Sequence, residues 1–317
     1  YVVAQIVGTG LIGARLLGMS FELAVFVGLV GILVCSMLGG MRAVTWTQVA
    51  QYIVLIVAYL IPVIILSTQK FGIPIPQLTY GQVLSEIQTK EAALGVSAAA
   101  SHVVPFARYD PLNFFALVLC LMVGTASLPH VLMRYFTTPS VREARSSVAW
   151  TLLFIFILYF TAPAYAAFAK LEVFENVIGK PLAQLPGWVY TYGKIGLVQI
   201  CGTNAVDVAT ITAACGKIAG HTGILQLANF SIQADAIVIA TPEIAGLPYV
   251  VSGLVAAGGL AAALSTADGL LLAIANALSH DVYARMINKN APVARKLIIA
   301  RVILVAVALV AAWVASG

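Results

Sequence analysis

Two hydroxyl residues within one long apolar stretch are the residues of this sequence best suited to binding a cation. Ser265 and Thr266 lie in residues 248–281, which are long and apolar enough for a helix to cross a bilayer. They follow Ala262 by three and four positions, so on a helix their hydroxyls project toward its carbonyl. If the helix loosens there, one carbonyl and two hydroxyls form a cluster of neutral oxygens, the kind of ligand set that holds sodium in transporters. The alternative is that both hydroxyls bond back to carbonyls of their own helix.

A carboxylate, Asp268, follows in the same stretch. A charge near the middle of a span costs about 2.5–3.5 kcal/mol on insertion scales, so such residues usually face an interior cavity and serve a function, here as a possible accessory charge. Asp268 could instead lie near the end of the helix, hydrated or paired with a cation. Small residues also recur every three or four positions along the stretch, which predicts close approach of another helix. These residues are Gly258, Ala262, Ser265, Gly269 and Ala273.

A second group of polar residues interrupts the apolar run 111–135. Pro129 has no amide hydrogen, so the carbonyl of Thr125 loses its helical partner. A break within a span is tolerated only where it is buried in protein or lines a cavity. His130 could bind a substrate there or carry a proton, and Thr125 and Ser127 could add hydroxyls as further candidate ligands. The alternatives are an ordinary proline kink and an interior histidine whose hydrogen bonds are satisfied.

The four cysteines divide by position. Cys35 and Cys120 lie inside apolar spans and are interpreted as packing residues. Cys201 and Cys215 lie in a long connection and could pair if it faces an oxidising compartment, which the sequence does not decide. Their neighbours show no spacing typical of a metal site.

The composition indicates an all-α polytopic membrane protein. Of the 317 residues, 61% are hydrophobic and only 9% are charged, against about 25% in a soluble domain. The net charge of +5 is interpreted as loop charge that sets topology, not as a nucleic-acid footprint. The spans carry no paired carboxylates and no nucleophile with a base, so an enzyme is not expected. Seven spans are predicted, at 1–17, 21–38, 44–68, 111–135, 146–169, 248–281 and 297–315.

Local signals predict where these spans begin and end, and which side of the membrane their connections face. Gly39-Gly40 is expected to stop the second helix, and Thr45 with Gln48 to form a capping box for the third. Arginine and lysine concentrate in the short connections, which the positive-inside rule makes cytoplasmic. The long connections 70–110 and 170–247 then face outside. Both ends of the chain look cut, so residues 1–317 are expected to be part of a single transmembrane domain.

Three segments resemble the sodium:solute symporter family, most closely its cation/acetate (monocarboxylate) branch: GGMRAVTWTQVAQY, GTASLPHVLMRYFTTPSVREAR and AAGGLAAALSTADGLLLAIANALSHDVY. The resemblance implies a leucine-transporter-like core of two inverted repeats, of which the seven spans would be core helices three to nine. The family's sodium site would carry over to Ala262, Ser265 and Thr266. Core helices one and two are not in this sequence, so we do not expect this piece to transport by itself.

The resemblance also implies a function, a sodium-coupled symporter in the plasma (inner) membrane. Its expected partners are Na⁺, a small organic anion such as acetate and the lipid bilayer, with no nucleic acid. A transporter-derived membrane sensor or scaffold, or proton coupling in place of sodium, is the alternative. Relatives often carry an acidic residue where this chain has Gln48, and we hypothesise that the negative charge has moved to Asp268.

Overall fold

A computed structural model describes residues 1–97, 100–107 and 109–316, and within these the side chains of 35 and 38–42 lie outside the description. Cys35, interpreted from the sequence as a packing residue, and Arg42, in the first short basic connection, are among the residues whose side chains are not described. Among the described residues, four helices are long and apolar enough to cross a membrane, or six if two bent pairs each count as one span. The protein is therefore an all-α polytopic membrane protein.

The chain divides into two compact units. The first unit comprises Tyr1–Ala58, Leu128–Ala144 and Ala256–Gly317, and the second comprises Tyr59–Ser127 and Arg145–Val255. The helices α2 (Phe21–Phe71), α6 (Val141–Asn176) and α10 (Tyr249–Asn276) each contribute residues to both.

The first unit also holds α1 (Val2–Leu17), the short α5 (Pro129–Tyr135), the π-helix η5 (Ala277–Ile287) and α11 (Val293–Ser316). The helix α1 ends at Gly18, whose left-handed backbone (φ 64°) suits a residue without a Cβ. The next helical segment, Phe21–Val34, is bent by 111° from α1. The sequence treats these two segments as separate spans, which explains why it predicts seven spans where the structure has four to six. An apolar core that includes Ile6, Leu271 and Ala308 joins α1, α2, α10 and α11.

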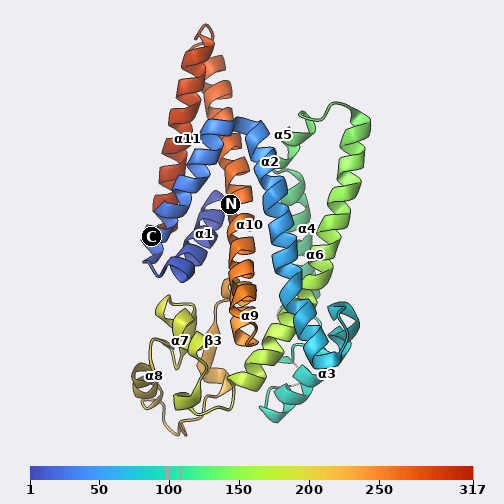
Figure 1. Cartoon of the computed structure of the whole chain (residues 1–317), viewed down its shortest axis with the longest axis vertical. Coiled ribbons are helices and arrows are strands. Elements are labelled where there is room, and N and C mark those ends of the chain that lie inside the picture. Colours follow the sequence, from blue (N-terminus) through green and yellow to red (C-terminus); the bar gives the residue numbers. More distant parts are fainter. Residues whose placement is uncertain (98–99, 108, 317) are drawn as a thin grey trace. The chain divides into compact units, whose positions relative to one another are not determined.

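The helix α2 differs from its prediction. It runs for 51 residues, and the expected stop at Gly39-Gly40 is wrong because helical structure continues through it. Figure 1 shows the blue ribbon of α2 rising, turning over and descending, so the direction of the chain reverses without a break in the helix. A continuous helix hydrogen-bonds its own backbone, so the turn leaves few amides and carbonyls without partners.

The second unit contains the helices α3 (Pro76–Ala93), α4 (Pro111–Ala126), α7 (Gly187–Lys194), α8 (Val208–Cys215) and α9 (Ile237–Ile244). Three short turns of 3-10 helix join them: η2 (Leu182–Gln184), η3 (Leu227–Asn229) and η4 (Ala234–Ala236). Both long connections thus contain short helices. One small antiparallel sheet was not predicted. Its strand order is β2 (Thr203–Asn204), β1 (Val198–Ile200), β3 (Phe230–Ile232).

A buried carboxylate fixes the connection after α3. Glu91 is 2% exposed and accepts hydrogen bonds from the amine of Lys170, the hydroxyl of Ser101 (2.6 Å) and the amide of His102 (3.0 Å). Burial alone would raise the pKa of the Glu91 carboxyl, but these donors outweigh it and hold the pKa below its ordinary value. The ionised carboxylate therefore ties α3, its following loop and α6 together.

Candidate functional site

The predicted oxygen cluster lies on α10. The hydroxyl of Ser265 is 2.9 Å and that of Thr266 is 3.4 Å from the carbonyl oxygen of Ala262, to which both donate. The helix is not loosened at this turn, because α10 is continuous from Tyr249 to Asn276. The three oxygens nevertheless converge as the i, i+3, i+4 spacing requires. The hydroxyls are bonded within their own helix, and their role in holding an ion stays a prediction.

A side chain from α2 reaches the same turn of α10. The amide nitrogen of Gln48 donates to the carbonyl oxygen of Ser265, 217 residues away in the sequence. Gln48 lies inside α2, so its predicted role in a capping box is wrong. Its hydrogen bond instead holds the Ser265 carbonyl from outside α10, next to the oxygen cluster.

Asp268 is buried within the first unit. It is 1% exposed, and its carboxylate accepts a 3.0 Å hydrogen bond from the hydroxyl of Ser36 on α2. The alternative of a hydrated position at the end of the helix is therefore wrong. Ser36, which is 4% exposed, was not singled out by the sequence because nothing in its own segment marks it.

The predicted stripe of small residues on α10 does bring neighbours close. A Cβ added at Gly258 would lie 2.4 Å from the Cβ of Ala58 on α2. At Gly269 it would lie 3.2 Å from a terminal guanidinium nitrogen (Nη2) of Arg134, 3.6 Å from Nε2 of Gln48 and 3.8 Å from Cδ2 of His130. Both glycines thus face other elements of the first unit at distances that leave little room for a side chain.

The predicted break in residues 111–135 is confirmed, because α4 ends at Ala126 and α5 begins at Pro129. Thr125 and Ser127 are exposed, and the Ser127 hydroxyl donates to the carbonyl of Gly124 (3.0 Å). His130 is buried, and its Nδ1 has no hydrogen-bond partner among the described residues, so the alternative of a satisfied histidine is wrong. Thr125 and Ser127 belong to the second unit and His130 to the first, and the joint role of the three in solute binding stays a prediction.

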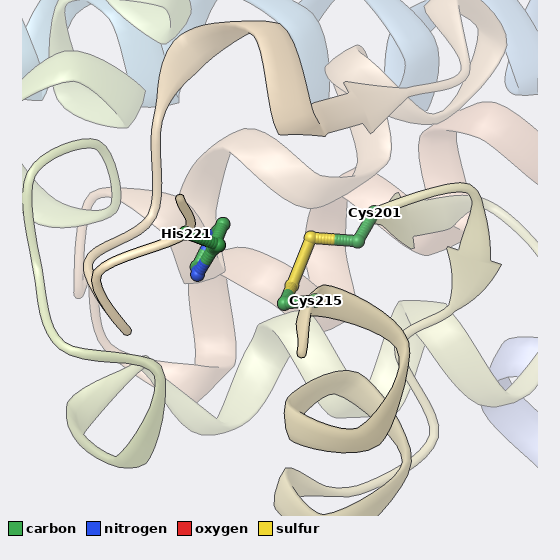
Figure 2. A group of neighbouring side chains, drawn as sticks. All are labelled: Cys201, Cys215 and His221. Atoms are coloured by element: carbon green, nitrogen blue, oxygen red, sulfur yellow. A yellow bond between two sulfur atoms is a disulfide. The ribbon is translucent and has the colours of Figure 1, made fainter. Parts of the chain in front are cut away.

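The connection after α7 contains a disulfide between Cys201 and Cys215, which answers the question that the sequence leaves open. Figure 2 shows His221 on the neighbouring loop, and its ring nitrogen lies within 4.8 Å of the two sulfur atoms. The amide of Gly223 donates to Nδ1 of His221 (3.1 Å), so the neutral ring carries its proton on Nε2. Bonded sulfurs and a protonated Nε2 do not suit a metal ion. Cys120, expected to pack, is an exposed free cysteine, so that prediction is wrong.

Comparison with known proteins gives the family. The model of the sodium:solute symporter family matches residues 1–184 and 185–316, so the chain belongs to the sodium:solute symporter family. A protein of Cupriavidus necator described as an uncharacterized symporter is 40% identical over 408 aligned residues. That alignment covers 100% of this chain and 58% of the relative, so the chain spans little more than half of the relative's length. No solved structure matches this chain.

Proposed function

We propose that the full protein is a sodium-coupled symporter of a small monocarboxylate such as acetate, in the plasma (inner) membrane. Membership of the sodium:solute symporter family and the similarity to a symporter of Cupriavidus necator support the class of solute symporter. The observation that carries sodium coupling is the convergence of the Ser265 and Thr266 hydroxyls on the Ala262 carbonyl. The choice of a monocarboxylate rests on the resemblance of the three sequence segments.

The oxygen cluster has the chemistry that a monovalent cation requires. A hydroxyl that donates its hydrogen to a carbonyl still has lone pairs to offer to a cation. The Asp268 carboxylate follows Thr266 by two residues in α10 and supplies the negative charge that neutral oxygens lack. Its bond to Ser36 holds it in the interior of the first unit, where screening by solvent is weak. A cation bound here would be coupled to the solute if both bind one conformation better than the other.

The disulfide supports the proposed sidedness. Cys201 and Cys215 lie in the long connection 170–247, and disulfides persist in oxidising compartments outside the cytoplasm. The positive-inside rule independently assigns the short basic connections to the cytoplasm. Both arguments give one topology, in which the connections 70–110 and 170–247 are extracytoplasmic.

The test is uptake of labelled acetate, lactate and pyruvate by the full-length protein in vesicles, with and without a sodium gradient. Thr266→Val removes a cluster hydroxyl, and Thr9→Val is its matched control. Thr9 is likewise a helical threonine whose hydroxyl donates to a carbonyl four residues earlier, that of Gln5 (3.0 Å), although Thr9 is buried and Thr266 is half-buried. We expect Thr266→Val to raise the sodium concentration for half-maximal uptake about tenfold or more, as loss of a ligand to a charged group does, and Thr9→Val to leave it unchanged.

Two results would reject the sodium site. Equal effects of Thr266→Val and Thr9→Val mean that the hydroxyls only satisfy their own helix. Uptake driven by a proton gradient without sodium means that the coupled ion is a proton. Asp268→Asn in the same assay tests the accessory charge, and unchanged sodium dependence would remove it from the proposal.

A further inference from the structure

An arginine of the first unit lacks an acidic partner. Arg134, near the end of α5, is half-buried, and its Nε donates to the carbonyl of His130 (3.2 Å). Among the described residues, no aspartate or glutamate lies within ion-pair distance of its guanidinium. A guanidinium withdrawn from water without a counter-ion is costly, and such charges within membrane proteins usually mark a ligand path.

A second polar group without a partner lies one helical turn away. His130 is 9% exposed, and its buried Nδ1 has no hydrogen-bond partner among the described residues. Leaving a buried polar nitrogen without a partner costs about 1–3 kcal/mol, so native proteins rarely do so without a reason. Arg134 and His130 thus combine a net positive charge with an unused imidazole nitrogen.

Gly269 of α10 brings the two side chains to one place. The position of a Cβ on Gly269 is 3.2 Å from Nη2 of Arg134 and 3.8 Å from Cδ2 of His130, so both side chains flank the same point. A glycine here lets the guanidinium lie directly against the backbone of α10. The carboxylate of the preceding residue, Asp268, is instead bonded to Ser36.

From these contacts we infer that Arg134 and His130 bind the carboxylate group of the transported solute, an inference that rests on the proposed function. The Nε of Arg134 is engaged by its own helix, which leaves the two terminal nitrogens to donate to carboxylate oxygens. The Cδ2 edge of the His130 ring faces Gly269, so Nδ1, when it carries the ring proton, supplies a third donor once the ring turns toward the bound carboxylate. The bound anion supplies both the charge that Arg134 lacks and the partner that His130 lacks. The site selects a carboxylate over the corresponding neutral amide.

The experiment compares Arg134→Gln and Arg134→Lys with Arg142→Gln in the full-length protein in proteoliposomes. Arg142 is an exposed arginine at the start of α6, so its substitution removes the same charge from the same unit. The measured quantities are the dissociation constant of labelled acetate, lactate or pyruvate at saturating sodium, and the thermal stabilisation by sodium alone. We expect Arg134→Gln to weaken solute binding about tenfold to a hundredfold, with Arg134→Lys intermediate because an ammonium lacks the planar fork. Arg142→Gln is expected to match the wild type, and all variants to keep the stabilisation by sodium.

A second pair of variants tests the geometry without removing a charge. Gly269→Ala places a methyl group against the guanidinium, whereas a Cβ at Gly253 of the same helix meets no described atom within 4 Å. We expect Gly269→Ala, and not Gly253→Ala, to weaken solute binding.

The outcomes separate the two proposals. If the wild type binds no monocarboxylate, the proposed function fails and the inference fails with it. If the wild type binds one and Arg134→Gln changes its dissociation constant less than twofold, the inference alone is overturned. It is also overturned if adding Asp268→Asn to Arg134→Gln restores binding, because Arg134 then acts by pairing with Asp268 in another conformation.

Discussion

At Gly258 the helix α10 lies close against α2, and Gly258→Ala tests whether that approach determines stability. The added Cβ would lie 2.4 Å from the Cβ of Ala58, whereas carbon atoms in contact are about 3.5–4.0 Å apart. A methyl group attached to the backbone cannot rotate away, so the helices must separate by roughly 1 Å or more. Overpacking of this kind costs about 1–3 kcal/mol.

The matched control separates this cost from helix propensity. Replacing glycine by alanine in a helix is favourable by up to about 1 kcal/mol, and this gain applies equally to Gly253→Ala, where the new methyl group meets no described atom within 4 Å. We therefore expect Gly258→Ala to be about 1–3 kcal/mol less stable than Gly253→Ala. The structure also predicts a rescue. Once the methyl group of Ala58 is removed, the nearest remaining atoms are Cα of Leu55 (3.5 Å) and the carbonyl oxygen of Val54 (3.6 Å), which are ordinary contacts.

The assay is equilibrium unfolding of the purified full-length protein in mixed micelles, with all four variants measured side by side. The double variant Ala58→Gly/Gly258→Ala should have a free energy of unfolding about 1 kcal/mol or more above the value calculated by adding the effects of Ala58→Gly and Gly258→Ala. Additive effects, or equal stabilities of Gly258→Ala and Gly253→Ala, would refute the close packing of α2 and α10 on which the contact between Gln48 and Ser265 depends.

Two further predictions concern the second unit. Reduction of the disulfide, or Cys215→Ser, should lower the stability of the connection 170–247 by about 3 kcal/mol, the chain-entropy estimate for a loop closed by cysteines 14 positions apart. It should also speed proteolysis of this connection. Cys120→Ser should do neither, because Cys120 is a free cysteine. Glu91→Gln should cost about 2 kcal/mol at pH 7, because a neutral amide forms weaker hydrogen bonds with Lys170. Since the pKa of Glu91 is lowered by folding, its contribution is complete above the ordinary carboxyl pKa and is lost as the pH falls through the lowered value. The stability difference between wild type and Glu91→Gln should therefore shrink on acidification, and a difference independent of pH would contradict the role of the charge.

The parts of the fold that the sequence predicts well depend on local signals. Long apolar runs identify α10 and α11, and Pro129 identifies the break after α4. The strands β1 and β3 pair Val198 with Ile232, and such a pairing across distant positions leaves no periodicity in either three-residue segment. The continuity of α2 through Gly39-Gly40 was missed for a different reason. Two adjacent glycines usually end a helix, and no local signal in the sequence marks this pair as an exception.

The same distinction applies to the site. The convergence of Ser265 and Thr266 on Ala262 follows from helical geometry alone, and the spacing predicts it. The bonds from Ser36 to Asp268 and from Gln48 to Ser265 join residues 232 and 217 positions apart, and no pattern in a single sequence reveals them. The sequence alone does not single out Arg134, because its lack of a counter-ion is visible only when its neighbours in space are known.

If both proposals hold, α10 explains coupling by simple electrostatics. The cation cluster ends at Thr266 and the proposed anion site adjoins Gly269, a rise of about 4.5 Å along the helix. At an illustrative separation of about 8 Å, two opposite unit charges attract by about 2 kcal/mol at an effective dielectric constant of 20, before the charges of Asp268 and Arg134 are counted. That attraction corresponds to a roughly thirtyfold gain in affinity, and by linkage each ligand strengthens the binding of the other to the same extent. Because α10 carries the cation ligands and Gly269 together, the two ions could stabilise one another without any movement of the helix between them.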